Sequence, residues 1–365
     1  MYLFFINIAV LSILTTLSVA PINYRKKSIS ARFLTVLGIS YLCFLSMCRG
    51  ISVGNDTYEY AVYFSRIAEQ NHILSYIKEA RFEPGYVLLN WAVSRFTSDY
   101  QVFFALTSLF TYCSVGRFFL HHSRYPVVSI YFFFTLLSFD FFLCAIRQEL
   151  AIAILLFAYD EMCDRRPLRY VALVLVAGMF HYTALLYLLV YMLISVKSRK
   201  KYIALLFLVT AALSIGFRTA LMLVLKVFPA YGSYLSGSYL ESDIKSSVVL
   251  YFAVYAYFIF AGERIGEIRH PERSAADELD WKLVWLLPAV CLISFNAPIV
   301  TRFLRYFQLH ILTYFPNALD RKAEPERWVL LYITMLATAV YALTVLLLRT
   351  PAWYSTYPYQ FFWNS

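Results

Sequence analysis

Long apolar runs recur from one end of the chain to the other, and they constrain the fold more than any other feature. Runs such as 2–20, 100–120 and 328–348 are long enough, as helices, to cross a hydrocarbon core of roughly 30 Å. The chain is 61% hydrophobic and 15% charged, whereas soluble proteins are about half apolar and about a quarter charged. The sequence therefore predicts an all-α, polytopic transmembrane helical bundle.

Lys and Arg are concentrated in short segments between the apolar runs, for example at Arg25-Lys26-Lys27. Cytoplasmic loops of membrane proteins carry such an excess, so it predicts the topology. It also accounts for most of the net charge of +10, and no nucleic-acid partner is predicted. We expect one domain, 1–365, with about 11–12 spans and both termini outside. The predicted cytoplasmic loops are 21–31, 160–169, 263–280 and 319–327, and the predicted outer segments are 49–83 and 218–246.

Two predicted elements are shorter than a full crossing. Glu83-Pro84 is a natural helix start, because proline is tolerated at the first helical position, and the helix after it ends near Phe96. This short helix is expected to be re-entrant or interfacial. The run 168–195 is interrupted by Gly178 and His181, which favours a broken hairpin with His181 near its outer tip; one long tilted helix is the alternative.

Cysteines and acidic residues give no sign of a metal site or a cofactor. The six cysteines lie in or at the ends of apolar runs and form no CxxC pair, so neither a metal site nor a disulfide framework is predicted. Hard cations need clustered carboxylates or substrate phosphates, and Asp56, Glu59 and Glu83 are among the acids of the first outer segment. No cofactor is predicted.

Polar residues gather on the predicted outer side. Arg49 ends a span and is followed by Gly54 and the polar trio Asn55-Asp56-Thr57, which could grip phosphate and sugar hydroxyls. Ionisable groups within or at the ends of spans are costly and indicate function. A guanidinium stays charged and binds phosphate oxygens two at a time, so the arginines suggest a diphosphate held at the lipid–water boundary. The other members on this side are Glu83, Arg147, His181, Arg302 and Arg305.

Each of these residues also has a simpler interpretation. Arg147 could pair with Asp140 or Glu149, and His181 could be a buried histidine bonded to a carbonyl. Arg49, Arg302 and Arg305 could anchor helix ends at the lipid headgroups.

In order and spacing, these residues resemble the EpsG-like branch of Wzy-type polysaccharide polymerases, over essentially the whole chain. The matching pieces are Arg49, Gly54, Asp56, Thr57, Tyr60 and Phe64, then Glu83-Pro84-Gly85-Tyr86, then Arg147, Leu150 and Ala151, then Phe180-His181 and Ala184, then Arg302, Arg305 and Tyr306, and last Tyr357-Pro358-Tyr359 with Phe361 and Phe362.

The resemblance implies a GT-C-like membrane fold and a glycosyltransferase of the bacterial cytoplasmic membrane, with its active site facing the exterior. Such enzymes transfer a growing glycan from undecaprenyl diphosphate onto the non-reducing end of a new lipid-linked repeat unit. By this analogy His181 or Asp56 is the base and Arg147 acts on the leaving diphosphate. A flippase and a chain-length regulator of the same pathway are candidate partners. The implied binding residues are Arg49, Asn55, Thr57, Glu83, Arg302, Arg305 and Tyr306.

Two other functions fit a polytopic chain with outer arginines. A flippase for lipid-linked oligosaccharides would spread basic residues through a central cavity and show repeated halves, which this sequence lacks. An O-antigen ligase-like transferase would carry a large outer loop late in the chain, whereas here the first outer segment comes early.

Overall fold

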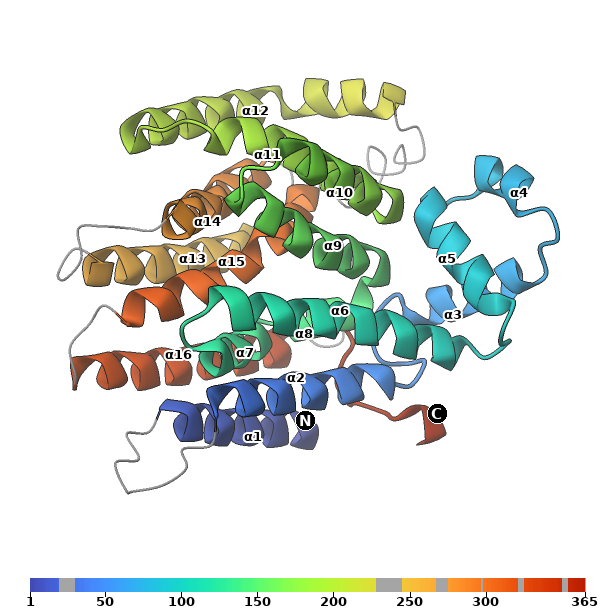
Figure 1. Cartoon of the computed structure of the whole chain (residues 1–365), viewed down its shortest axis with the longest axis horizontal. Coiled ribbons are helices and arrows are strands. Elements are labelled where there is room, and N and C mark those ends of the chain that lie inside the picture. Colours follow the sequence, from blue (N-terminus) through green and yellow to red (C-terminus); the bar gives the residue numbers. More distant parts are fainter. Residues whose placement is uncertain are drawn as a thin grey trace. The chain divides into compact units, whose positions relative to one another are not determined.

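The computed structural model describes residues 1–19, 30–227, 245–266, 275–296, 298–320, 325–349 and 354–364. Across these ranges the chain forms sixteen α-helices, short 3₁₀ turns and one isolated bridge between Arg49 and Phe361 (Figure 1). The predicted all-α helical bundle is confirmed.

Four helices in the described ranges are long and apolar enough to cross a membrane, by length and composition. They are α1 (Tyr2–Val19), α6 (Tyr100–His122), the first part of α12 (Arg199–Val227) and α16 (Glu326–Arg349). Shorter apolar helices span Ala31–Met47, Pro167–Phe180, Tyr182–Ile194 and Ser247–Glu263. The chain is therefore a membrane protein with several crossings, and the figure of about 11–12 spans stays a prediction.

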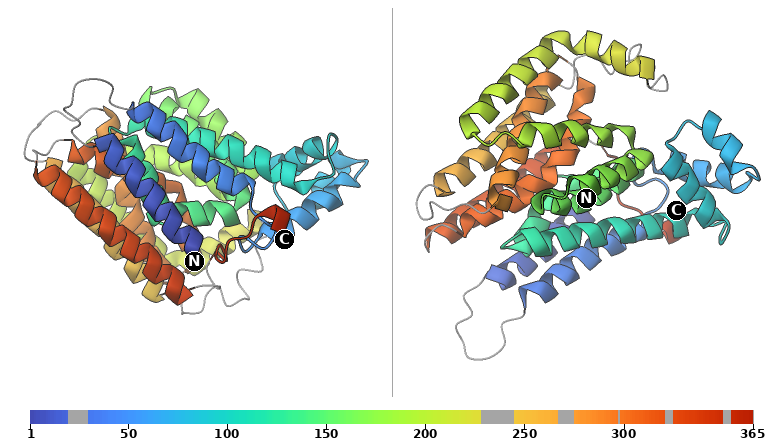
Figure 2. Two further views of the ribbon diagram at one scale, coloured as in Figure 1. Left: turned by 90° about the horizontal axis from the view of Figure 1, so that it is seen from below. Right: turned by 45° about the horizontal axis from the view of Figure 1, so that its top comes forward.

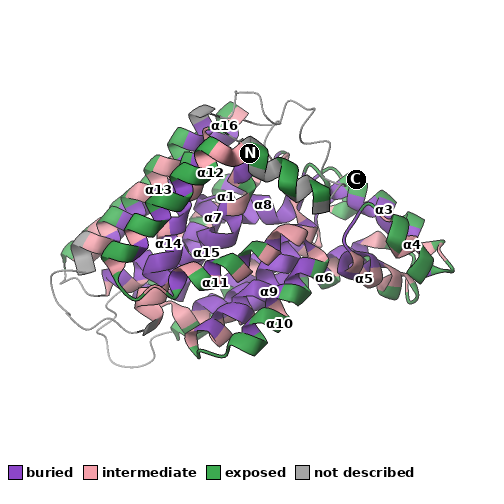
Figure 3. Cartoon of the chain, turned by 90° about the horizontal axis from the view of Figure 1, so that it is seen from above, coloured by how far each residue is buried: buried purple, intermediate pink, exposed green. Residues whose placement is uncertain are grey.

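The predicted span 126–144 is broken in the structure. It consists of α7 (Pro126–Thr135) and α8 (Ser138–Cys144), bent by 63° at a break where Leu137 adopts φ 59°. The pair could form a fifth crossing as one broken span. Every residue of both helices is buried, as Figure 3 shows, so this bend lies within the packed interior.

The chain divides into two compact units. Unit 1 comprises Met1–Leu185 and Ala323–Ser365, and unit 2 comprises Leu186–Lys322. Unit 1 contains α1, α6–α8 and α16 together with α2 (Ala31–Met47), α3 (Thr57–Ala68), α4 (Ile73–Glu79), α5 (Pro84–Ser94), α9 (Ile146–Cys163) and α10 (Pro167–Phe180).

Small residues let the first helices of unit 1 pack closely. A Cβ on Gly38 of α2 would meet Ile130 of α7 at 3.3 Å, and one on Gly116 of α6 would meet Ile39 at 3.1 Å. Helix pairs in membranes use small residues in this way to bring backbones together. In Figure 2, α1 and α2 run side by side within the unit.

The helices α3, α4 and α5 form a separate group beside the start of α6, as Figure 1 shows. The α5 helix begins as predicted, with Glu83 as its N-cap and Pro84 in its first turn. The α6 helix is capped by the Asp99 carboxylate, which accepts from the Gln101 amide at 2.8 Å. Aromatic side chains fill the core between α3 and α5, where the Tyr63 and Phe82 ring centroids lie 4.5 Å apart.

The C-terminal residues 354–364 return to the start of the first predicted outer segment. The Gly50 amide donates to the Gln360 carbonyl at 2.7 Å, and the Phe362 amide donates to the Cys48 carbonyl at 3.0 Å. These bonds pair residues 360–362 with residues 48–50 at the end of α2.

Unit 2 begins with α11 (Leu186–Ile194) and α12. Three further helices follow in order, α13 (Lys245–Gly266), α14 (Ala275–Ser294) and α15 (Leu304–Leu319), with a 3₁₀ helix, Pro298–Phe303, before the last. Lys282 of α14 is buried, and its Nζ donates to the carbonyls of Ile194 and Val196, both at 2.9 Å. Its charge is thus met by backbone oxygens at the end of α11.

Several predicted loops are shorter than expected or lie outside the described residues. Between α9 and α10 the loop is 164–166 rather than 160–169. The predicted outer segment 218–246 is helical up to Val227, and 228–244 lie outside the described residues. In the predicted loop 263–280, α13 extends to Gly266 and α14 starts at Ala275, because apolar and charged residues there continue the helical pattern. Residues 21–29 of the predicted loop 21–31 and residues 321–324 of the predicted loop 319–327 also lie outside the described residues.

Candidate functional site

A buried carboxylate, Glu83, joins a histidine and an arginine in unit 1. Its Oε1 lies 3.0 Å from His181 Nδ1, and its Oε2 accepts from Arg147 Nη1 at 2.5 Å. The backbone amide of Tyr182 also donates a hydrogen bond to Glu83 Oε1, at 3.4 Å. Three of the predicted site residues, which are far apart in the sequence, therefore meet at one point.

The three side chains differ in their exposure. Glu83 has 1% of its side chain exposed, against 10% for His181 and 21% for Arg147. The carboxylate is therefore the inner partner, and the two cationic or basic groups lie between it and the surroundings. The predicted role of Glu83 in substrate binding stays a prediction; in the structure its oxygens face donors of the chain itself.

Helix ends position each member of the site. Glu83 is the N-cap of α5, and Arg147 lies in the first turn of α9. At His181 the backbone becomes extended, with φ −155° and ψ 113°, which ends α10 at Phe180. The predicted break at His181 is confirmed, and it turns the imidazole out of the helical ladder towards the start of α5.

A glycine allows these helix ends to approach each other. A Cβ on Gly85 of α5 would lie 2.8 Å from the Met179 Cβ and 2.9 Å from the Met179 carbonyl oxygen. Those distances are below ordinary contact, so a larger residue would push α5 away from α10. Gly85 thus keeps Glu83 within reach of His181.

Aromatic residues cover the arginine. The Arg147 guanidinium lies over the Phe82 ring, 4.2 Å from its centroid, a cation–π geometry. The buried Tyr60 hydroxyl lies near the same guanidinium and interacts with it. Neither aromatic residue was predicted as part of the site, although Tyr60 belongs to the motif that carried the resemblance. Their proximity to Arg147 depends on tertiary contacts that no local pattern reveals.

The charges around Glu83 hold it ionised. Burial by itself would raise the pKa of the Glu83 carboxyl, but the His181 hydrogen bond and the Arg147 charge outweigh it and lower the pKa to about 2. An ionised carboxylate accepts the proton on His181 Nδ1, so this contact favours the tautomer whose basic nitrogen is Nε2. Chemically, the site offers an oriented base beside a fixed cation.

The alternative partners proposed for Arg147 are wrong. Arg147 binds Glu83, while the Asp140 carboxylate accepts from the Thr356 hydroxyl at 2.5 Å. Both Glu149 oxygens are buried without a hydrogen-bond partner. His181 Nδ1 bonds the Glu83 carboxylate.

Arg49 points into the helical core of unit 1. Its side chain is fully buried, and Nη1 donates to the Ser46 carbonyl at 2.7 Å and to the Ser108 hydroxyl at 3.3 Å. The guanidinium also lies 4.8 Å from the Phe104 ring centroid. The simpler interpretation of Arg49, an anchor at the lipid headgroups, is therefore wrong, because Ser108 of α6 supplies an oxygen inside the bundle.

The polar trio after Gly54 is divided between the surface and the interior. Asn55 and Asp56 are exposed, whereas Thr57 is buried and donates to the Val53 carbonyl at 2.6 Å. Gly54 has φ 95°, and a Cβ there would meet the Leu143 carbonyl oxygen at 2.6 Å. Glycine is required at this turn for both reasons.

The remaining predicted residues lie in unit 2. Arg302 is exposed near the end of the 3₁₀ helix, whereas Arg305 is buried in α15, so the two arginines differ in environment. Arg305 Nη2 donates to the Tyr251 hydroxyl at 3.1 Å. Tyr306 is buried, and its carbonyl accepts from Tyr187 at 2.7 Å.

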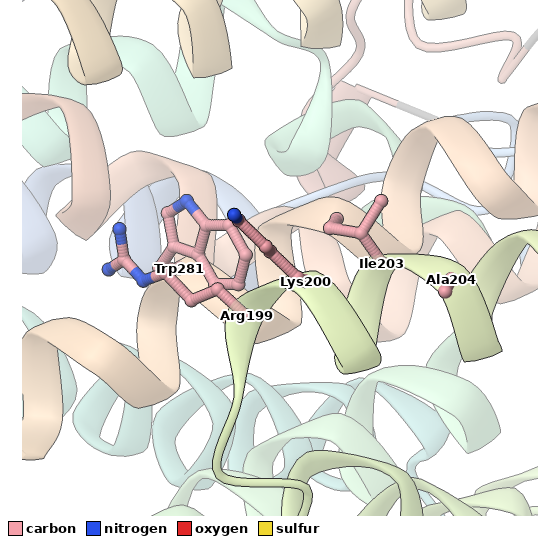
Figure 4. A pocket seen from close by; sticks show the side chains of 5 residues that line it. All are labelled: Arg199, Lys200, Ile203, Ala204 and Trp281. Atoms are coloured by element: carbon pink, nitrogen blue, oxygen red, sulfur yellow. The ribbon is translucent and has the colours of Figure 1, made fainter.

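Unit 2 also has a shallow cavity of about 420 Å³ at the start of α12 (Figure 4). Arg199 in its wall is bound by the Glu278 carboxylate at 2.6 Å and lies over the Trp281 ring. The other lining residues are Lys200, Ile203 and Ala204. None of the predicted site residues lines this cavity, so it is separate from the Glu83 site.

Comparison with known proteins gives one clear result. A protein-family model described as the EpsG family matches residues 31–361. This range includes every predicted site residue in both units. No curated protein and no solved structure matches the chain.

Proposed function

The chain belongs to the EpsG family, whose members are associated with polysaccharide biosynthesis, and from this premise we propose that it is a polysaccharide repeat-unit polymerase. The proposed donor is a growing glycan on undecaprenyl diphosphate. The acceptor is the non-reducing end of a new lipid-linked repeat unit.

The observation that carries the proposal is the Glu83 carboxylate bound to both His181 and Arg147. Glycosyl transfer from a lipid diphosphate needs a base for the acceptor hydroxyl and positive charge near the leaving phosphates. One carboxylate orients both groups here. Of the two candidate bases, His181 is favoured over the exposed Asp56, because its ring is held in a defined orientation.

In the proposed reaction the acceptor oxygen attacks the anomeric carbon of the donor's reducing-end sugar. The bond from that carbon to the phosphate oxygen breaks, and undecaprenyl diphosphate leaves with the electron pair. His181 Nε2 takes the proton of the acceptor hydroxyl. Arg147 binds the leaving diphosphate, and Glu83 is a positioning residue for both.

The other predicted binding residues differ in exposure, and therefore in whether they could contact the substrate directly. Asn55 and Asp56 are exposed and could contact sugar hydroxyls, and Arg302 is an exposed cation suited to phosphate. Arg49, Thr57, Arg305 and Tyr306 are buried and act on the substrate, in this proposal, through the residues they support.

The protein would work in the bacterial cytoplasmic membrane with its site towards the exterior. A flippase of the same pathway would supply the lipid-linked unit, and a chain-length regulator would be a further partner. The many outward-facing apolar side chains, such as Ile215 at 89% exposed, suit direct contact with lipid.

The test replaces His181 with alanine in cells that make the polysaccharide. The expected phenotype is accumulation of single lipid-linked units at the outer leaflet, where an external lectin or glycosidase reaches them. Units protected from the external probe would indicate a flippase. Lipid-linked polymer of normal length that is never transferred to its final acceptor would indicate a ligase-like transferase.

A purified system then tests the chemistry itself. Elongation of lipid-linked repeats in vesicles should fall about 10²- to 10⁴-fold in His181→Ala, the range for loss of a general base. The matched control is His72→Ala, since His72 is an exposed histidine of the same predicted outer side. A His181→Ala rate equal to wild type would remove this residue from the mechanism.

A further inference from the structure

The cavity at the start of α12 combines an apolar lining with a charged rim. Its volume of about 420 Å³ falls within the range of about 300–1,000 Å³ that is usual for ligand pockets. The Trp281 ring, Ile203 and Ala204 line it, and Arg199 and Lys200 lie at its end of α12 (Figure 4). A ligand that suits this cavity therefore has an apolar part and an anionic part.

Contacts within unit 2 hold the walls of the cavity in place. Lys282 Nζ of α14 donates to the Val196 carbonyl at 2.9 Å, just before α12. The Tyr202 hydroxyl of α12 donates to the Lys282 carbonyl at 2.6 Å. The Trp281 indole donates to Glu263 of α13, which fixes the orientation of its ring. The cavity is thus part of the packed structure of α12–α14.

The excess positive charge at the rim belongs to lysines. Arg199 is neutralised by Glu278, whose carboxylate accepts from Arg199 Nε at 2.9 Å and from Nη2 at 2.6 Å. The exposed cations beside this pair are Lys197, Lys200 and Lys201. Of these, Lys200 lines the cavity itself. An anion at the rim would therefore meet Lys200 first.

The face of α12 that carries Lys200 continues as an apolar stripe. The exposed positions that follow it at helical spacing are Ala204, Phe207, Leu208 and Ala211. Phe207 and Leu208 have 59% and 68% of their surface exposed. A lipid chain that starts in the cavity can continue along this face of α12 in contact with apolar side chains.

The predicted topology has this end of α12 at the cytoplasmic surface. The hairpin 168–195 leaves one basic loop and returns to another, the segment from Lys197 to Lys201. Arg199 in that segment binds Glu278, which belongs to the predicted cytoplasmic loop 263–280. Anionic lipids give the cytoplasmic leaflet a negative surface potential that attracts basic segments, and tryptophan is enriched at such interfaces.

We propose that this cavity binds an anionic phospholipid of the cytoplasmic leaflet, with the phosphate at Lys200 and the start of one acyl chain between Trp281 and Ala204. A zwitterionic phospholipid has the same chains, so selectivity for the anionic headgroup distinguishes a site from ordinary lipid contact. The inference goes beyond the proposed function and does not depend on it, since it concerns unit 2 and needs no polymerase activity.

The first measurement is quenching of tryptophan fluorescence by lipids brominated near the start of their acyl chains. In phosphatidylcholine nanodiscs, brominated phosphatidylglycerol should quench the purified protein more than brominated phosphatidylcholine at the same mole fraction. Trp281→Phe should remove this excess, because Trp281 lines the cavity. Lys200→Gln should also remove it. The excess should shrink as salt is added, because Lys200 is exposed and its charge is screened.

The same helix offers a matched control. Lys226 is an exposed lysine in the last turn of α12, far from the cavity. Lys226→Gln makes the same change of charge and should keep the excess quenching of wild type. Because both lysines are exposed, neither substitution removes a packed side chain.

The second measurement separates shape from charge. A lipid that binds only the folded protein raises its melting temperature, so phosphatidylglycerol added to the detergent-purified protein should raise it more than phosphatidylcholine does. Ala204→Trp fills the cavity without changing the charge, and it should reduce this difference, as Lys200→Gln should. Lys226→Gln should leave the difference unchanged.

Three outcomes would overturn the proposal. Equal effects of the two lipids on wild type would leave only ordinary lipid contact. An excess that persists in Lys200→Gln, or that Lys226→Gln removes equally, would exclude a headgroup site at Lys200. Excess quenching that undecaprenyl diphosphate displaces, but unlabelled phosphatidylglycerol does not, would assign the cavity to the substrate lipid instead.

Discussion

His181 Nδ1 lies 3.0 Å from Glu83 Oε1, although the two residues are 98 positions apart in the chain. The second oxygen of the same carboxylate binds Arg147, 64 positions away. A single buried acid therefore fixes the direction of both the proposed base and the proposed phosphate ligand. The carboxylate, rather than either of its less buried partners, determines the geometry of the site.

Arg147→Lys tests whether the guanidinium shape matters. Lysine keeps the charge but cannot form two parallel hydrogen bonds, so it cannot bind Glu83 and a phosphate oxygen in the same plane. The variant should insert normally and elongate at least about tenfold more slowly in vesicles. Near-normal polymer length on a gel would mean that simple charge is enough at this position.

Glu83→Gln tests the positioning role of the carboxylate. The amide can still hydrogen-bond one neighbour, but it no longer favours the His181 tautomer with a proton on Nδ1 and no longer balances Arg147. We expect kcat to fall by more than the donor KM changes, since in the proposed mechanism Glu83 positions His181 and Arg147 and does not bind the substrate. An unchanged kcat with a raised KM would instead indicate direct substrate binding by Glu83.

The low pKa of Glu83 gives a pH dependence of stability. The folded-state pKa of about 2 is below the ordinary value of 4.5, so ionised Glu83 stabilises the fold above pH 4.5. That contribution is lost as pH falls from about 4.5 towards 2. The melting temperature of wild type should therefore exceed that of Glu83→Gln at pH 5, and the gap should narrow at pH 4 and pH 3. A gap that widened with acid would contradict the ionised carboxylate.

Local features of this site were predictable from sequence, and its contacts were not. The helix start at Pro84 and the helix break at His181 follow from proline chemistry and from an interrupted apolar run. The distribution of Lys and Arg placed Glu83, Arg147 and His181 on the same predicted side of the membrane. Which of them touch depends on packing between α5, α9 and α10.

Arg49 illustrates the limit of sequence reasoning. An arginine at the end of an apolar run can turn to lipid headgroups or into the bundle, and the run itself is the same in both cases. Inside the bundle, the hydroxyls of Ser46 and Ser108 accept hydrogen bonds from Arg49, and Ser108 is 59 residues away in the sequence. Only the register between α2 and α6 determines that choice.

The membrane orientation can be tested with single cysteines in a variant that lacks the six native ones. Glu69→Cys lies in the predicted outer segment and Asp164→Cys in a predicted cytoplasmic loop, and both positions are exposed. An impermeant maleimide should label position 69 in intact spheroplasts, and position 164 only after permeabilisation. Labelling of position 164 in intact spheroplasts would reverse the topology and move the Glu83 site to the cytoplasmic face.

Gly85→Ala tests the close approach of α5 to α10. The added methyl would lie 2.8 Å from the Met179 Cβ and 2.9 Å from its carbonyl oxygen, so backbone has to move. Because Glu83 is two residues before Gly85, that movement should lengthen the Glu83–His181 contact and lower the elongation rate at least about tenfold.

Gly216→Ala is the matched control, since a Cβ there meets nothing within 4 Å. It should be neutral or slightly stabilising, because alanine favours a helix more than glycine does. Equal elongation rates for the two variants, with both proteins inserted, would show that the α5–α10 distance does not control the site.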